Sequence, residues 1–219
     1  MASGLKVLII GGVAAGPKTA ARLRRLDPTA EITIIEKGSF ISYAGCSLPY
    51  YVAGVVKEQK DLVATPVGVA RDPAFFQKMM NVQVLTQTEA LRVDRAAKRV
   101  EVRDASGARW LDYDVLVLAT GARPVVPKLP GADLPNVFTL HRIEDAEGIK
   151  ACLLGAPPEA REGQPSYFEH PTPHHSAVII GGGLIGVEMA EALAVPAPGM
   201  WLMRSRAAFG GASAVLPGA

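Results

Sequence analysis

A glycine-rich turn between an apolar strand and a helix occurs twice in this chain, and this repeat constrains the fold more than any other feature. The first copy places KVLII (residues 6–10) before GGVAAG (residues 11–16). The second copy places AVII (residues 177–180) before GGGLIG (residues 181–186). A continuous apolar run is typical of a strand buried on both faces of a parallel sheet. The repeat therefore predicts an α/β protein built on two βαβ-type units.

The first unit carries the residues that a dinucleotide site requires. Gly11 supplies the tight turn and Gly16 permits close packing of helix on strand, so that a pyrophosphate meets backbone N–H groups and a helix N-terminus. Val13 replaces the middle glycine of GxGxxG, and Gly12 keeps the turn small. Glu36 ends the next apolar run, where a carboxylate accepts the ribose hydroxyls and disfavours a 2′-phosphate. The alternative is a glycine-rich turn of another α/β fold.

The second unit matches the glycine pattern but is predicted to be incomplete. Gly181, Gly183 and Gly186 fit GxGxxG. Glu188 is interpreted either as a first-turn carboxylate that the helix dipole favours or as a cofactor contact. Residues 194–219 are rich in Ala, Gly and Pro and show no strand periodicity. We therefore expect neither the second strand of the unit nor the acidic residue that ends it.

The chain between the two units is predicted to hold short strands and a linker. Four short runs between residues 82 and 113 alternate with turn residues, and residues 104–107 predict a hairpin connection. VLVL (residues 115–118) predicts another buried strand. Residues 123–135 carry four prolines, which is typical of a linker.

Composition excludes several classes of function. The formal net charge is +2, which favours neither nucleic acid nor an anionic membrane surface as a partner. No stretch approaches the roughly 20 apolar residues that span a bilayer, and no secretory signal is found. Three histidines (His170, His174 and His175) lie in a proline-broken segment that predicts a loop, so we expect no metal site. Two cysteines without a disulfide framework indicate a cytoplasmic protein.

Cys46 is the candidate redox centre. Pro49 fits the first turn of a helix with Ser47 as its cap, which would place the sulfur near a helix N-terminus that favours the thiolate. The alternative is a small buried apolar side chain, and position alone leaves both interpretations open. Cys152 lies in an apolar helical run and is interpreted as packing.

Six segments resemble, in order, one branch of the flavin-dependent pyridine nucleotide–disulfide oxidoreductases: VLIIGGVAAG, RRLDP, IIEKG, ISYAGCSLPYY, LVLATGARP and IIGGGLIGVEMAEAL. This branch contains coenzyme A-disulfide reductases, NADH oxidases and polysulfide reductases, which use one cysteine where related classes use two. The resemblance implies a Rossmann-like FAD-binding domain with a parallel sheet and a small antiparallel β-meander over residues 1–150. A linker over 151–176 and the start of a Rossmann-like NAD(P)-binding domain over 177–219 would follow.

The resemblance also implies a reaction. Electrons would pass from NAD(P)H to FAD and then through Cys46 to a small disulfide, persulfide or polysulfide, with coenzyme A as a candidate substrate. The first glycine turn lacks the histidine of oxidase members, which favours disulfide chemistry over oxygen. The alternatives are an NADH oxidase, a ferredoxin- or rubredoxin-type flavin reductase, and a truncated FAD-binding fragment without activity. Family members are longer and add a domain that forms a homodimer, so this chain resembles a truncated member.

Site residues are transferred by match to the family. Cys46 would be catalytic, although Gly45 and Ser47 beside it depart from the family's usual neighbours. The residues expected to bind FAD are Gly11, Gly12, Val13, Ala14, Ala15, Gly16, Glu36, Lys37, Ser42, Ala90, Ala119, Thr120 and Gly121. Those expected to bind NAD(P)H are Gly181, Gly183, Gly186 and Glu188. Those expected to contact the substrate are Lys18, Arg22, Arg25 and Ser42.

Overall fold

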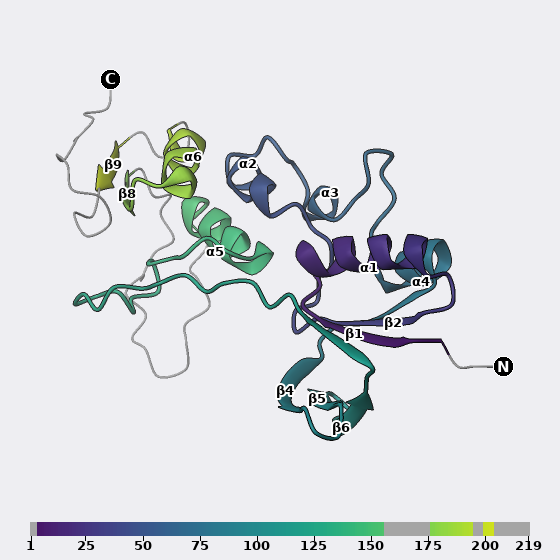
Figure 1. Ribbon diagram of the computed structural model, residues 1–219. Coiled ribbons are helices and arrows are strands. Elements are labelled where there is room, and N and C mark those ends of the chain that lie inside the picture. The colour runs from purple at the N-terminus through teal and green to yellow at the C-terminus, as the bar shows by residue number, and fades with distance from the viewer. Residues whose placement is uncertain (1–3, 156–175, 195–198, 204–219) are drawn as a thin grey trace. The chain divides into compact units, whose positions relative to one another are not determined.

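The computed structural model describes residues 4–155, 176–194 and 199–203 and divides into two compact units (Figure 1). Unit 1 comprises Met1–Ala44 and Val63–Ala122, and unit 2 comprises Gly45–Leu62 and Arg123–Ala219. Residues 45–62 thus group with the C-terminal part of the chain, whereas the sequence placed them in the first predicted domain.

Unit 1 is built on a four-stranded parallel sheet in the order β3-β2-β1-β7. Its strands are β1 (Lys6–Ile10), β2 (Glu31–Ile35), β3 (Val82–Leu85) and β7 (Val115–Leu118). Ile9 on β1 pairs with Ile34 on β2 and with Val117 on β7, and both isoleucines are fully buried. The apolar runs of β1 and β2 therefore form central strands covered on both faces, and the parallel sheet confirms the predicted α/β class.

Helices α1 (Ala15–Leu26) and α4 (Pro73–Met80) cover one face of this sheet. Helix α4 begins where the Asp72 carboxylate accepts a 2.7 Å hydrogen bond from the Phe75 N–H, and it ends at Asn81 in the left-handed region. Phe76 of α4 and Ala20 of α1 lie in the same buried cluster.

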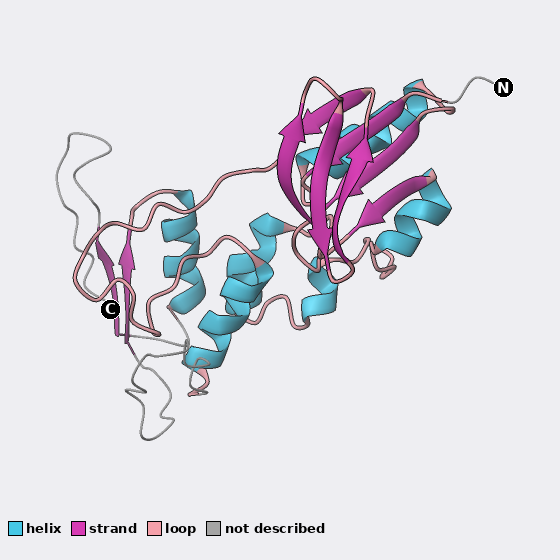
Figure 2. Cartoon of the chain, turned by 90° about the horizontal axis from the view of Figure 1, so that it is seen from below, coloured by secondary structure: helices cyan, strands magenta, loops and turns pink. Residues whose placement is uncertain are grey.

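The opposite face carries the predicted antiparallel meander of β4 (Glu89–Asp94), β5 (Arg99–Asp104) and β6 (Gly107–Asp112) (Figure 2). Val100 and Val102 of β5 are fully buried in a cluster with Leu8 and Ile35 of the sheet. The sequence grouped residues 82–84 with these short strands, but β3 pairs in parallel with β2.

The outer face of the meander is polar and holds a stacked cluster. The guanidinium groups of Arg92 and Arg99 lie 5.0 Å and 4.4 Å from the Trp110 ring centroid. Arg92 also pairs with Glu101, and Arg99 pairs with Asp94. These contacts cover the indole on an otherwise solvated surface.

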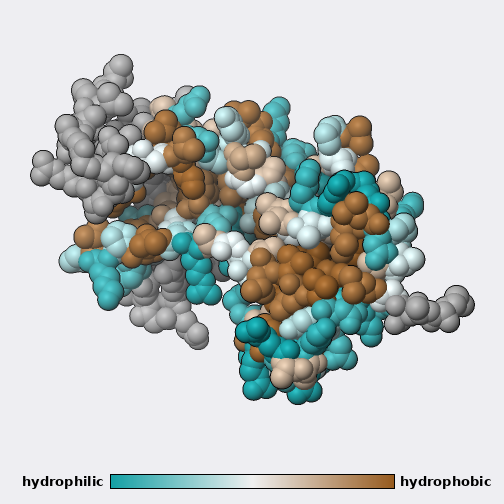
Figure 3. Space-filling view, in the orientation of Figure 1, coloured by the Kyte–Doolittle hydropathy of each residue, from teal (hydrophilic) through white to brown (hydrophobic). Residues whose placement is uncertain are grey.

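Strand β7 forms one edge of the unit 1 sheet among the described residues. Val115 and Leu118 on it are 42% and 67% exposed, and apolar side chains gather over this strand (Figure 3). The prediction that VLVL forms a buried strand was therefore wrong, because β7 has a neighbouring strand on one side only among the described residues. An exposed apolar edge of this kind is a surface that further protein usually covers.

Unit 2 consists of short helices and two strands. They are the 3-10 turn Gly45–Ser47, α2 (Leu48–Val52), α3 (Gln59–Leu62), α5 (Ile143–Leu153), β8 (Ser176–Ile180), α6 (Leu184–Leu193) and β9 (Gly199–Met203). Helix α2 packs against α5 and α6. No helix of the described ranges is both long and apolar enough to cross a membrane.

Strand β9 corrects the prediction that no strand follows the second glycine turn. It pairs in parallel with β8, with Ile180 opposite Met203, so the second βαβ unit has its second strand. The prediction failed because it required periodicity, whereas MWLM is an uninterrupted apolar run, which is typical of a strand in a parallel sheet. Strand β8 is not buried on both faces as predicted, since Val178 and Ile180 are each 58% exposed.

Candidate functional site

The glycine turn of unit 1 excludes side chains at two positions. Gly11 has φ +113°, and a Cβ there would lie 2.1 Å from the carbonyl oxygen of Ala119. A Cβ at Gly16 would lie 1.9 Å from the carbonyl oxygen of Gly11. The turn therefore follows β1 tightly and touches the chain leaving β7. Strands β2 and β7 lie on opposite sides of β1, and α/β sheets bind ligands at the carboxyl ends of strands where the strand order reverses in this way.

Glu36 joins the glycine turn to the end of β2. Its Oε2 accepts a 2.7 Å hydrogen bond from the Gly12 N–H, and its Oε1 accepts a 2.7 Å bond from the Gly38 N–H. The carboxylate is thus fixed beside the turn before any ligand arrives. Each carboxylate oxygen has a second acceptor site, so Glu36 can still accept hydroxyl donors.

Ser42 also lies against the glycine turn. Its backbone N–H donates a 2.8 Å hydrogen bond to the Gly12 carbonyl oxygen, and its φ of +53° is in the left-handed region. Such a conformation is uncommon for a residue with a side chain and persists where surrounding contacts hold it. The structure therefore brings Ser42 together with Gly11, Gly16 and Glu36.

Lys37 and Ala90 lie beside this group but are engaged with the meander. The Lys37 ammonium pairs with Glu89 at 2.7 Å, and Arg103 pairs with the other oxygen of Glu89 at 3.0 Å. The hydrogen bonds from Lys37 and Arg103 lower the pKa of the Glu89 carboxyl. Ala90 is half-buried and packs on the cluster below the sheet. Gly121, with φ +69°, follows β7 two residues beyond Ala119.

Thr88 is a residue of this region that the sequence did not reveal. It is 2% exposed, its N–H donates to the Glu36 carbonyl oxygen at 3.0 Å, and its hydroxyl donates to the Thr86 carbonyl oxygen at 2.9 Å. Nothing in the sequence around a single threonine between two short strands indicates that it supports the backbone of Glu36, because that contact depends on tertiary structure.

Three basic residues predicted to meet substrate phosphates lie along α1. Lys18, Arg22 and Arg25 are exposed and follow one another at spacings of four and three residues, which places them on one face of the helix. Arg24 of the same run is different. Its guanidinium donates to the carbonyl oxygens of Met80 at 2.9 Å and Asn81 at 2.7 Å, so it ties α1 to the end of α4.

Cys46 lies in the 3-10 turn before α2 and is exposed. The predicted cap was wrong: the Ser47 side chain makes no capping hydrogen bond, because its backbone is already in the helical region. Pro49 does lie in the first turn, as predicted, but α2 is only five residues long. Cys152 is buried on α5, and this burial raises the pKa of its thiol.

The second glycine turn repeats the geometry of the first. Gly181 has φ +124°, and a Cβ at Gly186 would lie 1.9 Å from the Gly181 carbonyl oxygen. Gly183 is the N-cap residue of α6. The first-turn interpretation of Glu188 was wrong, because α6 begins at Leu184 and has no acidic residue in its first turn.

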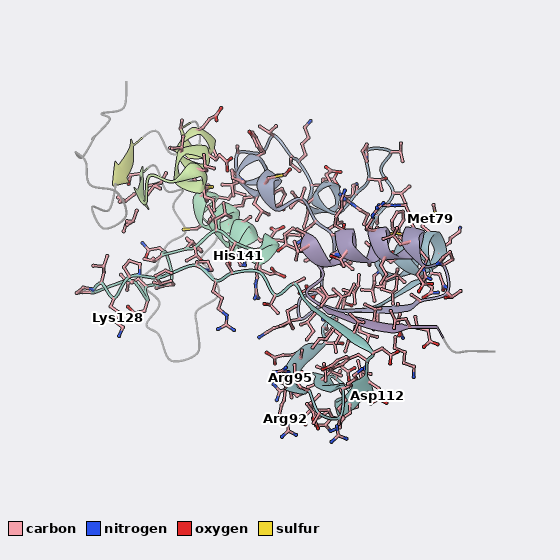
Figure 4. The ribbon with its side chains drawn as sticks, viewed as in Figure 1. Met79, Arg92, Arg95, Asp112, Lys128 and His141 are labelled. Carbon is pink, nitrogen blue, oxygen red and sulfur yellow. The ribbon has the colours of Figure 1, made fainter. Side chains whose placement is uncertain are left out.

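The predicted site residues thus fall into two groups. Unit 1 holds those expected to bind FAD and to contact the substrate, whereas unit 2 holds Cys46 and those expected to bind NAD(P)H. Within the described residues no three metal-ligating side chains cluster. His141 is exposed just before α5 (Figure 4), and His170, His174 and His175 lie outside the described residues.

Two glycine turns of this geometry, each between a parallel strand and a helix, are typical of the class of proteins that bind dinucleotides. Comparison with known families makes this specific: the chain belongs to the pyridine nucleotide-disulphide oxidoreductase family, whose model matches residues 5–197. This confirms the resemblance inferred from the sequence.

Three relatives show where in the family the similarity lies. An NADH oxidase of Methanocaldococcus jannaschii is 33% identical over 190 residues, covering 86% of this chain and 38% of the relative. An NAD(P)H coenzyme A polysulfide/persulfide reductase of Pyrococcus horikoshii is 36% identical over 189 residues, covering 86% of this chain and 37% of the relative. The solved structure of a NAD-dependent persulfide reductase from A. fulgidus matches with a TM-score of 0.78 and 41% identity over 90% of this chain and 33% of that chain. The chain therefore spans well under half the length of these relatives.

Proposed function

We propose that this chain supplies the FAD-binding part and the redox cysteine of an oxidoreductase that passes electrons from NAD(P)H to a disulfide, persulfide or polysulfide. The observation that carries this proposal is the closed glycine turn of unit 1. Gly11 and Gly16 leave no room for a side chain, and Glu36 lies hydrogen-bonded to the same turn. A pyrophosphate requires this close approach to backbone, and a ribose requires this carboxylate.

The residues of unit 1 fit FAD. Gly11, Gly12 and Gly16, with Val13, Ala14 and Ala15 between them, would hold the pyrophosphate through backbone N–H groups, and Glu36 would hold the ribose. Ser42, Lys37, Ala90 and the chain after β7 (Ala119, Thr120 and Gly121) would complete the site. In unit 2, Gly181, Gly183 and Gly186, with Glu188 behind them, would hold NAD(P)H in the same way.

Cys46 would carry the chemistry on the substrate. Its thiolate attacks one sulfur of the substrate, the S–S bond breaks, and the other sulfur leaves as a thiolate or sulfide. A mixed disulfide or a persulfide remains on Cys46. The two electrons that FAD supplies when bound would restore the Cys46 thiolate and release the attached sulfur as a thiolate or sulfide. The exposure of Cys46 supports this role, because a nucleophilic thiol must be accessible.

Coenzyme A is the proposed carrier of the substrate sulfur. Lys18, Arg22 and Arg25 form an exposed basic row on α1 that suits phosphate groups. The Pyrococcus horikoshii relative is named as a coenzyme A polysulfide/persulfide reductase, which supports the same substrate class.

Oxidase activity is the second candidate, because the Methanocaldococcus jannaschii relative is named as an NADH oxidase. One experiment separates the candidates. The purified chain is loaded with FAD, mixed with NADH or NADPH without oxygen, and then given either coenzyme A persulfide or oxygen. We expect the nucleotide to make the flavin colour fade. Persulfide should then restore the colour in the parent but not in Cys46→Ser.

Return of the colour with oxygen alone would favour the oxidase. A chain that binds FAD but does not fade with either nucleotide would support a fragment without activity. A chain that does not bind FAD would refute the proposal.

A further inference from the structure

Tyr51 joins the helix that follows Cys46 to a distant part of unit 2. Its hydroxyl donates a 2.5 Å hydrogen bond to Oε1 of Glu147, and the Lys150 ammonium lies 3.7 Å from the centroid of its ring. Glu147 and Lys150 are three residues apart on α5 and so reach the same ring from one helix face. The Tyr51 side chain is only 4% exposed.

Helix α2 depends on such tertiary contacts for its stability. It has five residues, and isolated helices shorter than about 12 residues are marginal in water. The Ser47 side chain does not cap it. Leu48 and Val52 are buried on it, and it packs against α5 and α6, so tertiary contacts determine where it lies.

We propose that Tyr51, Glu147 and Lys150 act as positioning residues that fix α2, and with it the turn bearing Cys46, on helix α5. The inference rests on the proposed role of Cys46 in thiol–disulfide exchange. A mobile Cys46 turn would still react with a small reagent, which can approach the sulfur in many orientations. A bulky disulfide has fewer productive approaches, so its in-line attack gains more from a sulfur held in place.

The charge of Glu147 strengthens its hydrogen bond with Tyr51. Burial first, and then the hydrogen bond and charge of Glu147, raise the pKa of Tyr51 to about 12. The hydroxyl therefore stays protonated, and donates to Glu147, at every pH at which a thiol would work. A hydrogen bond to a charged group is among the stronger ones in proteins.

Amide hydrogen exchange tests whether Tyr51, Glu147 and Lys150 fix α2 on α5, and it needs neither FAD nor turnover. The N–H groups of Ala53 and Val55 donate to carbonyl oxygens of α2 and report on its opening. We expect Tyr51→Phe to accelerate their exchange roughly tenfold or more, since hydrogen bonds to charged groups have that strength. Tyr50→Phe is the matched control, because Tyr50 is 47% exposed, and it should change nothing. Glu147→Gln, which keeps an acceptor, should disturb exchange less than Glu147→Ala.

Two thiol measurements separate positioning from general stability. Cys152 is buried on α5, so its alkylation by iodoacetamide reports opening of both α2 and α5. This alkylation should stay slow in Tyr51→Phe. In Tyr51→Phe, the rate at which Cys46 reacts with coenzyme A disulfide should fall several-fold relative to the rate at which it reacts with iodoacetamide.

Unchanged exchange in Tyr51→Phe, a reactive Cys152, or an unchanged ratio of the two Cys46 rates would each overturn the inference. Failure of the proposed function would differ: Cys46 of the parent chain itself would not react with the disulfide.

Discussion

Replacing Gly16 by alanine places a methyl group where the structure has no room. Its Cβ would lie 1.9 Å from a carbonyl oxygen, and reaching the 3.0 Å that real Cβ atoms keep requires the turn to move by about 1.1 Å. Overpacking of this kind costs about 1–3 kcal/mol, and the better helix propensity of alanine returns up to about 1 kcal/mol. The net cost of restoring the native turn is about 0–3 kcal/mol. FAD binds only the native turn in this proposal, so binding bears that cost, and a middle value of about 1–2 kcal/mol corresponds to a roughly five- to thirtyfold loss of FAD affinity.

The assay is an equilibrium titration that follows the quenching of FAD fluorescence, with thermal unfolding measured in parallel. Gly186→Ala is the matched control, because its Cβ would meet a carbonyl oxygen at the same 1.9 Å in the second turn. It should lower stability but leave FAD affinity unchanged. Gly183→Ala, whose Cβ would meet nothing within 4 Å, should leave FAD affinity unchanged and lower stability only through the poorer N-cap of α6. FAD affinity that is unchanged in Gly16→Ala, or equally reduced in Gly186→Ala, would refute the assignment of FAD to the first turn.

Three further predictions concern stability. The pKa of Tyr51 is raised from 10.0 to about 12, so its contribution is full below pH 10.0 and is lost as the pH rises to about 12. Unfolding midpoints of the parent should therefore fall more steeply over that interval than those of Tyr51→Phe; parallel curves would contradict this. Arg24→Ala should destabilise the chain by about 1–3 kcal/mol, because its hydrogen bonds to the carbonyl oxygens of Met80 and Asn81 are lost together with those to Asp27 and Pro28. Arg22→Ala should have little effect, and equal effects in chemical denaturation would refute the distinction. Asp72→Ala should cost about 1 kcal/mol in the same assay through the lost N-cap, and an unchanged midpoint would contradict it.

The sequence predicts the parts of this protein that depend on local chemistry. The runs around Ile9 and Ile34 are apolar because both faces of a parallel sheet are covered. Gly16 is required by a backbone contact only five residues away, with the Gly11 carbonyl oxygen, and Gly11 by its positive φ as well as by the distant Ala119 carbonyl oxygen. The hairpin before Gly107 is predicted for the same reason, since its φ of +108° suits glycine.

Features that depend on distant contacts could not be predicted. Arg22 and Arg24 are equivalent in sequence, yet only Arg24 reaches the end of α4. Tyr51 and Glu147 are 96 residues apart, and nothing in either segment identifies the other. Strand pairing is equally non-local, which is why β3 was grouped with the wrong strands. Strand β9 is a different case, since its apolar run was visible in the sequence but was judged by the wrong pattern.

In the proposed reaction Cys46 accepts electrons through FAD and passes them to a sulfur substrate. The most direct measurement is the intact mass of the FAD-loaded chain after treatment with coenzyme A disulfide, before and after addition of NADH or NADPH. We expect one coenzyme A adduct, located on Cys46, that one of the nucleotides removes only when FAD is bound. An adduct on Cys152, or an adduct on Cys46 that neither nucleotide removes, would contradict it.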